Sequence, residues 1–329
     1  MKLSVSKKML PSFAVFSLGL FALFATVLYA TAPAGLPGGK ITEPALWSPG
    51  KLAIDADGIL YVVDGYPGSI RRFDPTGRAL ASIQIDRPSA VAVGQGGTLY
   101  LGSHRDYSVA LYRKGQQAGY LGAGKGEFSS VLDIAVDEST GDVYVADAVG
   151  NKVGVYYASG GAKLFFSGFA APIAVAVADD EVYVLDTPPL LSGAGVGARI
   201  SVLSRTGVPI RTIDERIAKD RHMMRPADIA VDRSGNIFVA DAFRDAVLIF
   251  DTLGTFIGEI TGTESIKNAV AVAVTGDNRL YVSSGRTRDV VEIGLGGEVH
   301  ASERLTLDFH SVTGDRLTPA ALGYAGVAP

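Results

Sequence analysis

The chain has 329 residues, of which 47% are hydrophobic and 40 are glycine; it has no cysteine and a formal net charge of −4. Without cysteine it cannot form disulfides, thiolate zinc sites or covalent haem links, and an acidic chain lacks the dense cationic face that duplex DNA binding requires. The length suits one large domain or two small ones, and the many glycines among Val, Ile, Tyr and Phe favour a turn-rich all-β protein.

Residues 1–34 are predicted to form a signal peptide or an N-terminal transmembrane anchor, in either case as an apolar helix. Lys2, Lys7 and Lys8 precede an uncharged stretch whose apolar heart is Phe13–Ala30. This run is long for a signal peptide and about long enough to span a bilayer, and Ala32-Pro33-Ala34 fits a cleavage site, so both alternatives stay open. Either way, the rest of the chain is expected to be extracytoplasmic, in the periplasm or at the cell surface.

Residues 35–48 are predicted to be a linker that includes a possible closing strand, Lys40–Trp47. Beyond it, an apolar triplet with Tyr or Phe at its centre recurs six times at spacings of 39, 44, 39, 55 and 43 residues. The triplets begin at Leu60, Leu99, Val143, Val182, Ile237 and Leu280. A period near 40 residues with several short strands per repeat is the signature of propeller blades.

Each repeat is predicted to contain four antiparallel strands. An apolar strand with a small central Ala, such as Ile229-Ala230-Val231, precedes each triplet, a third apolar strand follows it, and a weaker fourth strand completes the blade. The prediction is therefore an all-β, six-bladed β-propeller over residues 49–309, followed by a tail over 310–329. The outer strand of the last blade is expected from Glu298–Leu305 or from the N-terminal Lys40–Trp47.

The pattern of Pro226–Asp251, PADIAVDRSGNIFVADAFRDAVLIFD, resembles the NHL repeat. The resemblance covers residues 49–297 and implies a six-bladed propeller. NHL proteins are mostly interaction platforms, whereas related six-bladed propellers include peptidyl-amidating lyases, gluconolactonase-like hydrolases and streptogramin lyases. The resemblance is therefore specific for fold and poor for function.

The position just before each first strand should surround the mouth of the axial channel. It is charged in blades one, three and five, as Lys51, Asp133 and Asp228, and Ala in the other three. One interpretation is a polar ring that holds calcium, another divalent cation or a small ligand. The other is that the two carboxylates cap strand entries and pair with Lys51 or an Arg. No cofactor is predicted beyond the possible cation.

The loops on the face where the channel mouth lies are rich in cations. The partner-binding candidates on this face are Arg105, Leu190, Leu191, Arg199, Arg221, Met223, Met224, Arg225, Arg244 and Arg288. Several of them fall in two insertions, Thr187–Ala198 and Asp214–Arg225, which break the repeat period and should lie side by side. Long neighbouring loops with apolar tips are reasonable partner contacts, although they can also pack on each other as a lid.

Two further sets of residues are expected to be structural. The residue after each second strand is Asp or Ser and is predicted to accept backbone N–H bonds; the set is Asp64, Ser103, Asp147, Asp186, Asp241 and Ser284. The four His residues do not converge on the channel, so no zinc site is predicted.

These observations favour a non-catalytic protein- or ligand-binding scaffold in a cell-envelope assembly. A protein partner is expected, with membrane attachment through the N-terminal segment and no nucleic acid. The alternative is a metal-dependent lyase or lactone hydrolase with its site at the channel mouth. The sequence does not determine the oligomeric state.

Overall fold

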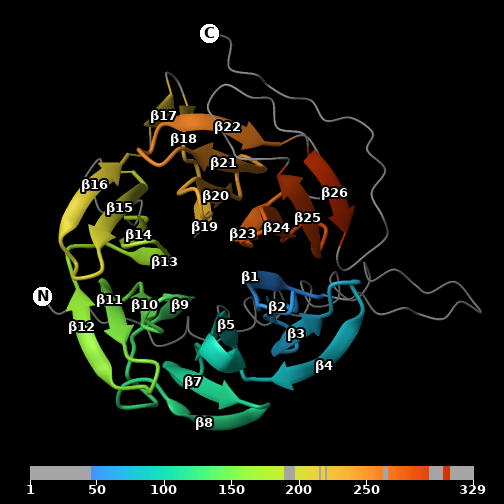
Figure 1. Ribbon diagram of the computed structural model, residues 1–329, viewed down its shortest axis with the longest axis vertical. Helices are drawn as coiled ribbons and strands as arrows, with labels where there is room; N and C mark the ends of the chain where they lie inside the picture. Colours follow the sequence, from blue (N-terminus) through green and yellow to red (C-terminus); the bar gives the residue numbers. More distant parts are fainter. Residues whose placement is uncertain are drawn as a thin grey trace, which may run out of the picture. The chain divides into compact units, whose positions relative to one another are not determined.

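The computed structural model describes residues 46–188, 197–214, 216–218, 221–261, 266–295 and 307–311. The predicted signal or anchor segment, most of the linker and the tail beyond Ser311 lie outside these ranges. Within them, no helix is long and apolar enough to cross a membrane. What the described ranges contain is a ring of six four-stranded antiparallel sheets, the predicted six-bladed β-propeller (Figure 1).

The blades follow one another along the chain. Blade one contains β1 (Pro49–Ile54), β2 (Leu60–Asp64), β3 (Ser69–Phe73) and β4 (Ala79–Gln84). Blade two contains β5 (Pro88–Gly94), β6 (Thr98–Ser103), β7 (Ser108–Arg113) and β8 (Gln116–Tyr120). Blade three contains β9 (Val131–Val136), β10 (Val143–Asp147), β11 (Lys152–Tyr156) and β12 (Ala162–Phe166).

The second half of the ring repeats the arrangement. Blade four contains β13 (Pro172–Ala178), β14 (Glu181–Asp186), β15 (Arg199–Ser204) and β16 (Pro209–Ile213). Blade five contains β19 (Pro226–Val231), β20 (Ile237–Asp241), β21 (Ala246–Phe250) and β22 (Phe256–Ile260). Blade six contains β23 (Ala269–Val274), β24 (Arg279–Ser284), β25 (Asp289–Leu295) and β26 (Leu307–Ser311). The first strand of each blade lines the centre of the ring and the fourth lies on its rim (Figure 1).

The core is divided into six clusters, one between each pair of neighbouring blades. Because both faces of a blade are covered, the second strands are buried along their whole length in β2, β10 and β20. The ring closes directly between blades six and one, where Leu52 and Leu60 pack against Tyr281 and Val290. The small Ala at the centre of each first strand fits the crowding around the axis.

Two features differ from the sequence prediction. The outer strand of blade six does come from the C-terminal side, but it is β26, which lies beyond the predicted Glu298–Leu305 and extends past Phe309 into the predicted tail. The insertion before blade five contains a small antiparallel ladder of β17 (Arg216–Ala218) and β18 (Arg221–His222). The ladder has no counterpart in the other repeats, so the alignment could not predict it.

The two ends of the ring carry different connections. The loops between second and third strands and the links from one blade to the next lie at one end, which we call the top face. The turns between first and second strands and between third and fourth strands lie at the other end, the bottom face. This division follows from the antiparallel order of every blade.

Candidate functional site: the axis and the top face

A β-bulge places the predicted channel-mouth residues. Each first strand has a register irregularity just after its first residue, as between Pro226 and Asp228 or between Val131 and Asp133. The same irregularity occurs in the other four first strands. A bulge bends a strand and re-aims the side chain that follows it. In blades one, three and five, that side chain is charged.

The structure brings Lys51, Asp133 and Asp228 together across the axis. The Lys51 ammonium lies 2.5 Å from Asp228 Oδ1 and 3.3 Å from Asp133 Oδ2. Its side chain is only 11% exposed, and those of the two carboxylates are 9% and 5% exposed. One ammonium from blade one therefore joins the carboxylates of blades three and five, and we call these residues the axial triad.

Each carboxylate of the axial triad is also bonded to the next blade. Asp133 Oδ2 accepts a hydrogen bond from the Val175 amide at 2.9 Å, and Asp228 Oδ2 accepts one from the Val272 amide at 3.0 Å. The Ala residues at the equivalent positions of blades two, four and six are fully buried. The Ala residues thus leave room for the three charged side chains to meet. The ion pairs and these two hydrogen bonds together link every blade except blade two.

Burial dominates the electrostatics of the axial triad. Desolvation, partly offset by the Lys51 ammonium and reinforced by Asp228, raises the pKa of Asp133 to about 7. Desolvation lowers the pKa of Lys51, but the two carboxylates outweigh it, so the pKa lies above its usual value. A buried carboxyl with such a pKa can exchange a proton near neutrality, whereas the ammonium stays charged.

The Lys51 ammonium supplies the two carboxylates with a cation from the chain itself. This is the pairing that the second sequence interpretation predicts. The described residues contain no group of three or more His, Asp or Glu side chains that could hold a metal ion. A divalent cation at this point would have to compete with the ammonium for the same carboxylate oxygens.

The recurrent Asp or Ser after each second strand acts as a clamp at the top face. Asp241 accepts hydrogen bonds from the amides of Met224 and Arg225, which enter the blade, and from the amides of Phe243 and Arg244, which leave the second strand. Asp64, Asp147 and Asp186 likewise accept from the segment that enters their blades. Ser103 and Ser284 instead donate to a carbonyl of that segment. The predicted bonds from the following turn are present at Asp241, Asp147, Ser103 and Ser284, which therefore tie two loops together. Among the described residues, Asp64 accepts from the entering segment alone, and Asp186 accepts from that segment and from Arg199.

The predicted top-face cations divide into two groups. Arg199 is bonded to Asp186 and to the Gly168 carbonyl, and Arg244 is bonded to Glu259 and is largely buried. These two serve the packing of their own blades. Arg105, Arg225 and Arg288 are exposed, and the last two lie over the rings of Phe243 and Trp47, respectively, with 5.0 Å and 5.9 Å to the ring centroids.

The remaining partner-binding candidates have mixed outcomes. Met224 is exposed as predicted, but Met223 is buried in the cluster between blades four and five, because successive residues of an extended segment point to opposite sides. Met223 is therefore not available to a partner. Leu190 and Leu191, and the side chain of Arg221, lie outside the described residues.

The top face also carries a set of exposed apolar side chains, of which the sequence analysis named only Met224. They project from the second-to-third loops of four blades and from two blade-entry segments, and their exposed fractions lie between 38% and 70%. The set, which we call the apolar crown, is Trp47, Tyr66, Tyr107, Val149, Met224 and Phe243. A signal existed: an apolar residue stands two positions after the clamp in Asp64-Gly65-Tyr66, Asp147-Ala148-Val149 and Asp241-Ala242-Phe243.

A cavity of about 1030 Å³ lies at the bottom face, at the opposite end of the axis. Its apolar part is formed by the ends of first strands, including Val93, Val136 and Val274, and its polar part by the following turns, including Glu138 and Arg233. Ion pairs cross the axis near the top, while the open volume faces the bottom.

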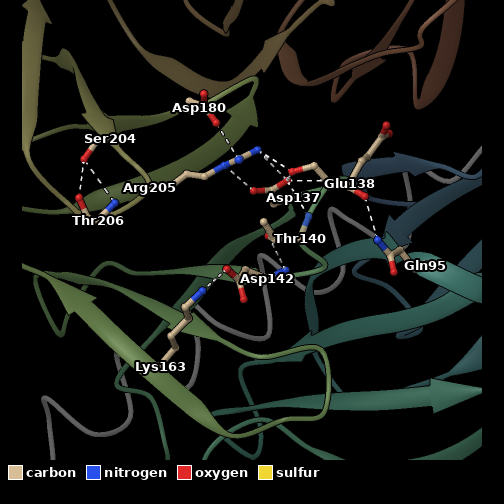
Figure 2. Close-up of polar contacts among 11 residues, drawn as sticks. Gln95, Asp137, Glu138, Thr140, Asp142, Lys163, Asp180, Ser204, Arg205 and Thr206 are labelled. Atoms are coloured by element: carbon tan, nitrogen blue, oxygen red, sulfur yellow. Dashed lines mark hydrogen bonds and ion pairs between the residues drawn. The ribbon is translucent and has the colours of Figure 1, made fainter.

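The turns around this end are held by polar contacts between blades two, three and four (Figure 2). Arg205 forms ion pairs with Asp137 and Asp180, both at 2.7 Å, and the Gln95 amide donates to the Glu138 carbonyl at 2.9 Å. Although burial opposes it, the hydrogen bonds from Ser139 and Thr140 hold the pKa of Asp137 below its usual value. The ion pairs of Arg205 thus join the turns of blades three and four.

Comparison with known proteins shows the fold alone. No known family and no curated protein sequence matches the chain. Among solved structures, a streptogramin B lyase matches with a TM-score of 0.55 and 12% identity, covering 75% of this chain and 93% of the other. The gluconolactonase XC5397 from Xanthomonas campestris matches with 0.57 and 17%, covering 73% and 84%. A chain of a nidogen/laminin complex matches with 0.57 and 16%, covering 72% and 89%.

Proposed function

We propose that this protein is a non-catalytic binding scaffold of an extracytoplasmic cell-envelope assembly, and that its top face is the binding surface. The observation that carries the proposal is the apolar crown with its exposed Arg side chains. Tyr, Trp, Met and Arg are the residue types enriched where proteins meet partners. The resemblance of the repeats to NHL repeats supports the same function, because NHL proteins are mostly interaction platforms.

A photo-crosslinking amino acid at Tyr66 or Phe243, in the full chain in native membranes, tests this scaffold. Matched positions at Val208 and Leu253 are equally exposed but lie on the bottom face. We expect covalent adducts, of whatever chemical class, from the two top positions and few from the two bottom positions. Adducts at the bottom positions only, or at none of the four, would contradict a top-face scaffold.

A second candidate function is a lyase or lactone hydrolase that uses the axial triad. Two carboxylates meet there, one with a pKa near neutrality, and two of the structures with a similar fold are a streptogramin B lyase and a gluconolactonase. Calorimetric titration with calcium distinguishes the two proposals. A tightly bound cation that is lost in Asp133→Asn plus Asp228→Asn, with the fold intact, would favour the enzyme.

A further inference from the structure

We infer that the top face docks on a bilayer surface of anionic phospholipids, with the apolar crown inserted among the headgroups. This inference rests on the scaffold proposal and names the partner of the same face. Three independent features support it: the way in which the apolar side chains are spaced, the sign of the exposed charge, and the point at which the chain enters the ring.

The crown is spread around the ring rather than gathered into one apolar patch. Its residues project from loops of blades one, two, three and five, and Trp47 and Tyr66 pack edge to face, with 6.2 Å between their ring centroids. A protein interface places its apolar residues in a contiguous core surrounded by a polar rim. Aromatic side chains that enter a membrane interface do not need to touch each other, because lipid surrounds each one.

The exposed charge of the top face is positive, although the whole chain is acidic. Among the described residues of the top loops, the charged side chains classed as exposed include two acids, Asp86 and Asp214, and six cations. Two of these cations lie near acids: Arg105 is 3.8 Å from Asp86 and Lys125 is 2.8 Å from Asp106. The cations are Arg87, Arg105, Lys125, Arg225, Arg286 and Arg288. Near an anionic bilayer, each such cation contributes about 1 kcal/mol of attraction. The face therefore presents apolar tips with cations between them, the combination that binds lipid interfaces.

The chain also enters the ring on this face. Trp47 lies two residues before Pro49, the first residue of β1, at the top end of that strand. Fifteen residues (31–45) separate Ala30, the end of the predicted apolar segment, from Leu46. Such a length spans at most about 50 Å when fully extended. If the apolar segment is retained as an anchor, the tether joins the ring on the face that carries the crown.

The single tryptophan of the chain provides a direct test, because Trp47 belongs to the crown. The full chain is reconstituted into vesicles of phosphatidylglycerol or of phosphatidylcholine, each with and without brominated acyl chains. We expect Trp47 emission to shift to the blue and to be quenched by brominated lipid in the anionic vesicles. Docking should be weaker in phosphatidylcholine and at high salt. Emission that stays accessible to aqueous acrylamide in both lipids would overturn the inference.

Two variants make the readout specific. The triple variant R105E/R225E/R286E changes only exposed side chains and leaves Arg288 beside Trp47. In anionic vesicles, its ratio of docked to undocked protein should be at least about tenfold lower than that of the unmodified protein. Unchanged quenching in this variant would overturn the role of charge.

Leu253→Trp on a Trp47→Phe background reports on the bottom face and should show no bromolipid quenching. Equal quenching there would mean that no particular face is docked.

A protein partner remains distinguishable from lipid. If Trp47 becomes protected in native membranes but not in pure anionic vesicles, the lipid inference fails while the scaffold proposal stands. If neither setting protects Trp47 and no adduct forms at Tyr66 or Phe243, both fail.

Discussion

At the scale of single residues, the axial triad shows how a buried charge can be structural. A carboxylate that loses water must find a cation or a proton. Asp228 has the Lys51 ammonium at 2.5 Å, while Asp133 lies farther from it, at 3.3 Å, and has the pKa that is raised to about 7. The sequence identified these three positions from their alternation with Ala. It could not say whether they pair with one another, because pairing depends on bulges that aim the side chains.

The raised pKa of Asp133 predicts that the free energy of unfolding depends on pH. Folded Asp133 keeps a proton that the unfolded chain releases above its ordinary pKa near 4, so the folded state binds more protons between about pH 4 and 7. The free energy of unfolding should therefore fall across this window by up to about 1.4 kcal/mol per pH unit and level off above it. Asp133→Asn should remove this contribution, which urea denaturation of both proteins at pH 5, 6, 7 and 8 would reveal as a difference in slope. Parallel profiles would contradict the raised pKa.

At the scale of elements, the repeat alignment predicted almost every strand, because the apolar triplets and the Asp-Gly turns recur in register. It failed at β26, the fourth strand of blade six, which lies farther along the chain than predicted, and at the ladder of β17 and β18, which has no equivalent in another repeat. It also missed the apolar crown except Met224, since single apolar residues at loop tips are common on protein surfaces and carry little weight without a structure. The chemistry of the clamp residues predicted that they accept backbone N–H bonds. It did not predict that a clamp joins two loops.

The clamp of blade five gives a prediction for one element. Asp241→Ala removes the acceptor for four backbone N–H groups and should lower the free energy of unfolding by about 2–4 kcal/mol. Asp241→Ser, the residue that blades two and six use, should cost less. Hydrogen exchange should become faster at the amides of Met224 and Arg225 in the Ala variant. An Asp241→Ala variant as stable as the unmodified protein would show that the carboxylate is not the clamp.

At the scale of the whole molecule, the closed ring should behave as one cooperative unit. An open array of repeats has ends from which it can unravel, whereas here every blade packs between two neighbours and blade six contacts blade one. The axial triad adds links between blades that are not neighbours. Loss of any one blade would therefore expose two clusters of the core and disturb the axis.

Lys51→Met tests this cooperativity. Removal of the ammonium leaves two buried carboxylates without a cation and should cost about 3–5 kcal/mol at pH 8. The triple variant Lys51→Met, Asp133→Asn and Asp228→Asn should recover most of the loss. Unfolding followed by Trp47 fluorescence and by far-ultraviolet circular dichroism should coincide in all three proteins. Separate transitions would show that the blades open one by one.

The span of the triad along the chain has a consequence for biosynthesis. Lys51 belongs to the first blade to leave the ribosome, and Asp228, 177 residues later, belongs to the fifth. Until that residue is in place, the Lys51 ammonium lacks the nearer of its two carboxylates. A chain that terminates before it also lacks the blades that close the ring, and we expect such fragments to be marked for proteolysis while complete rings are spared.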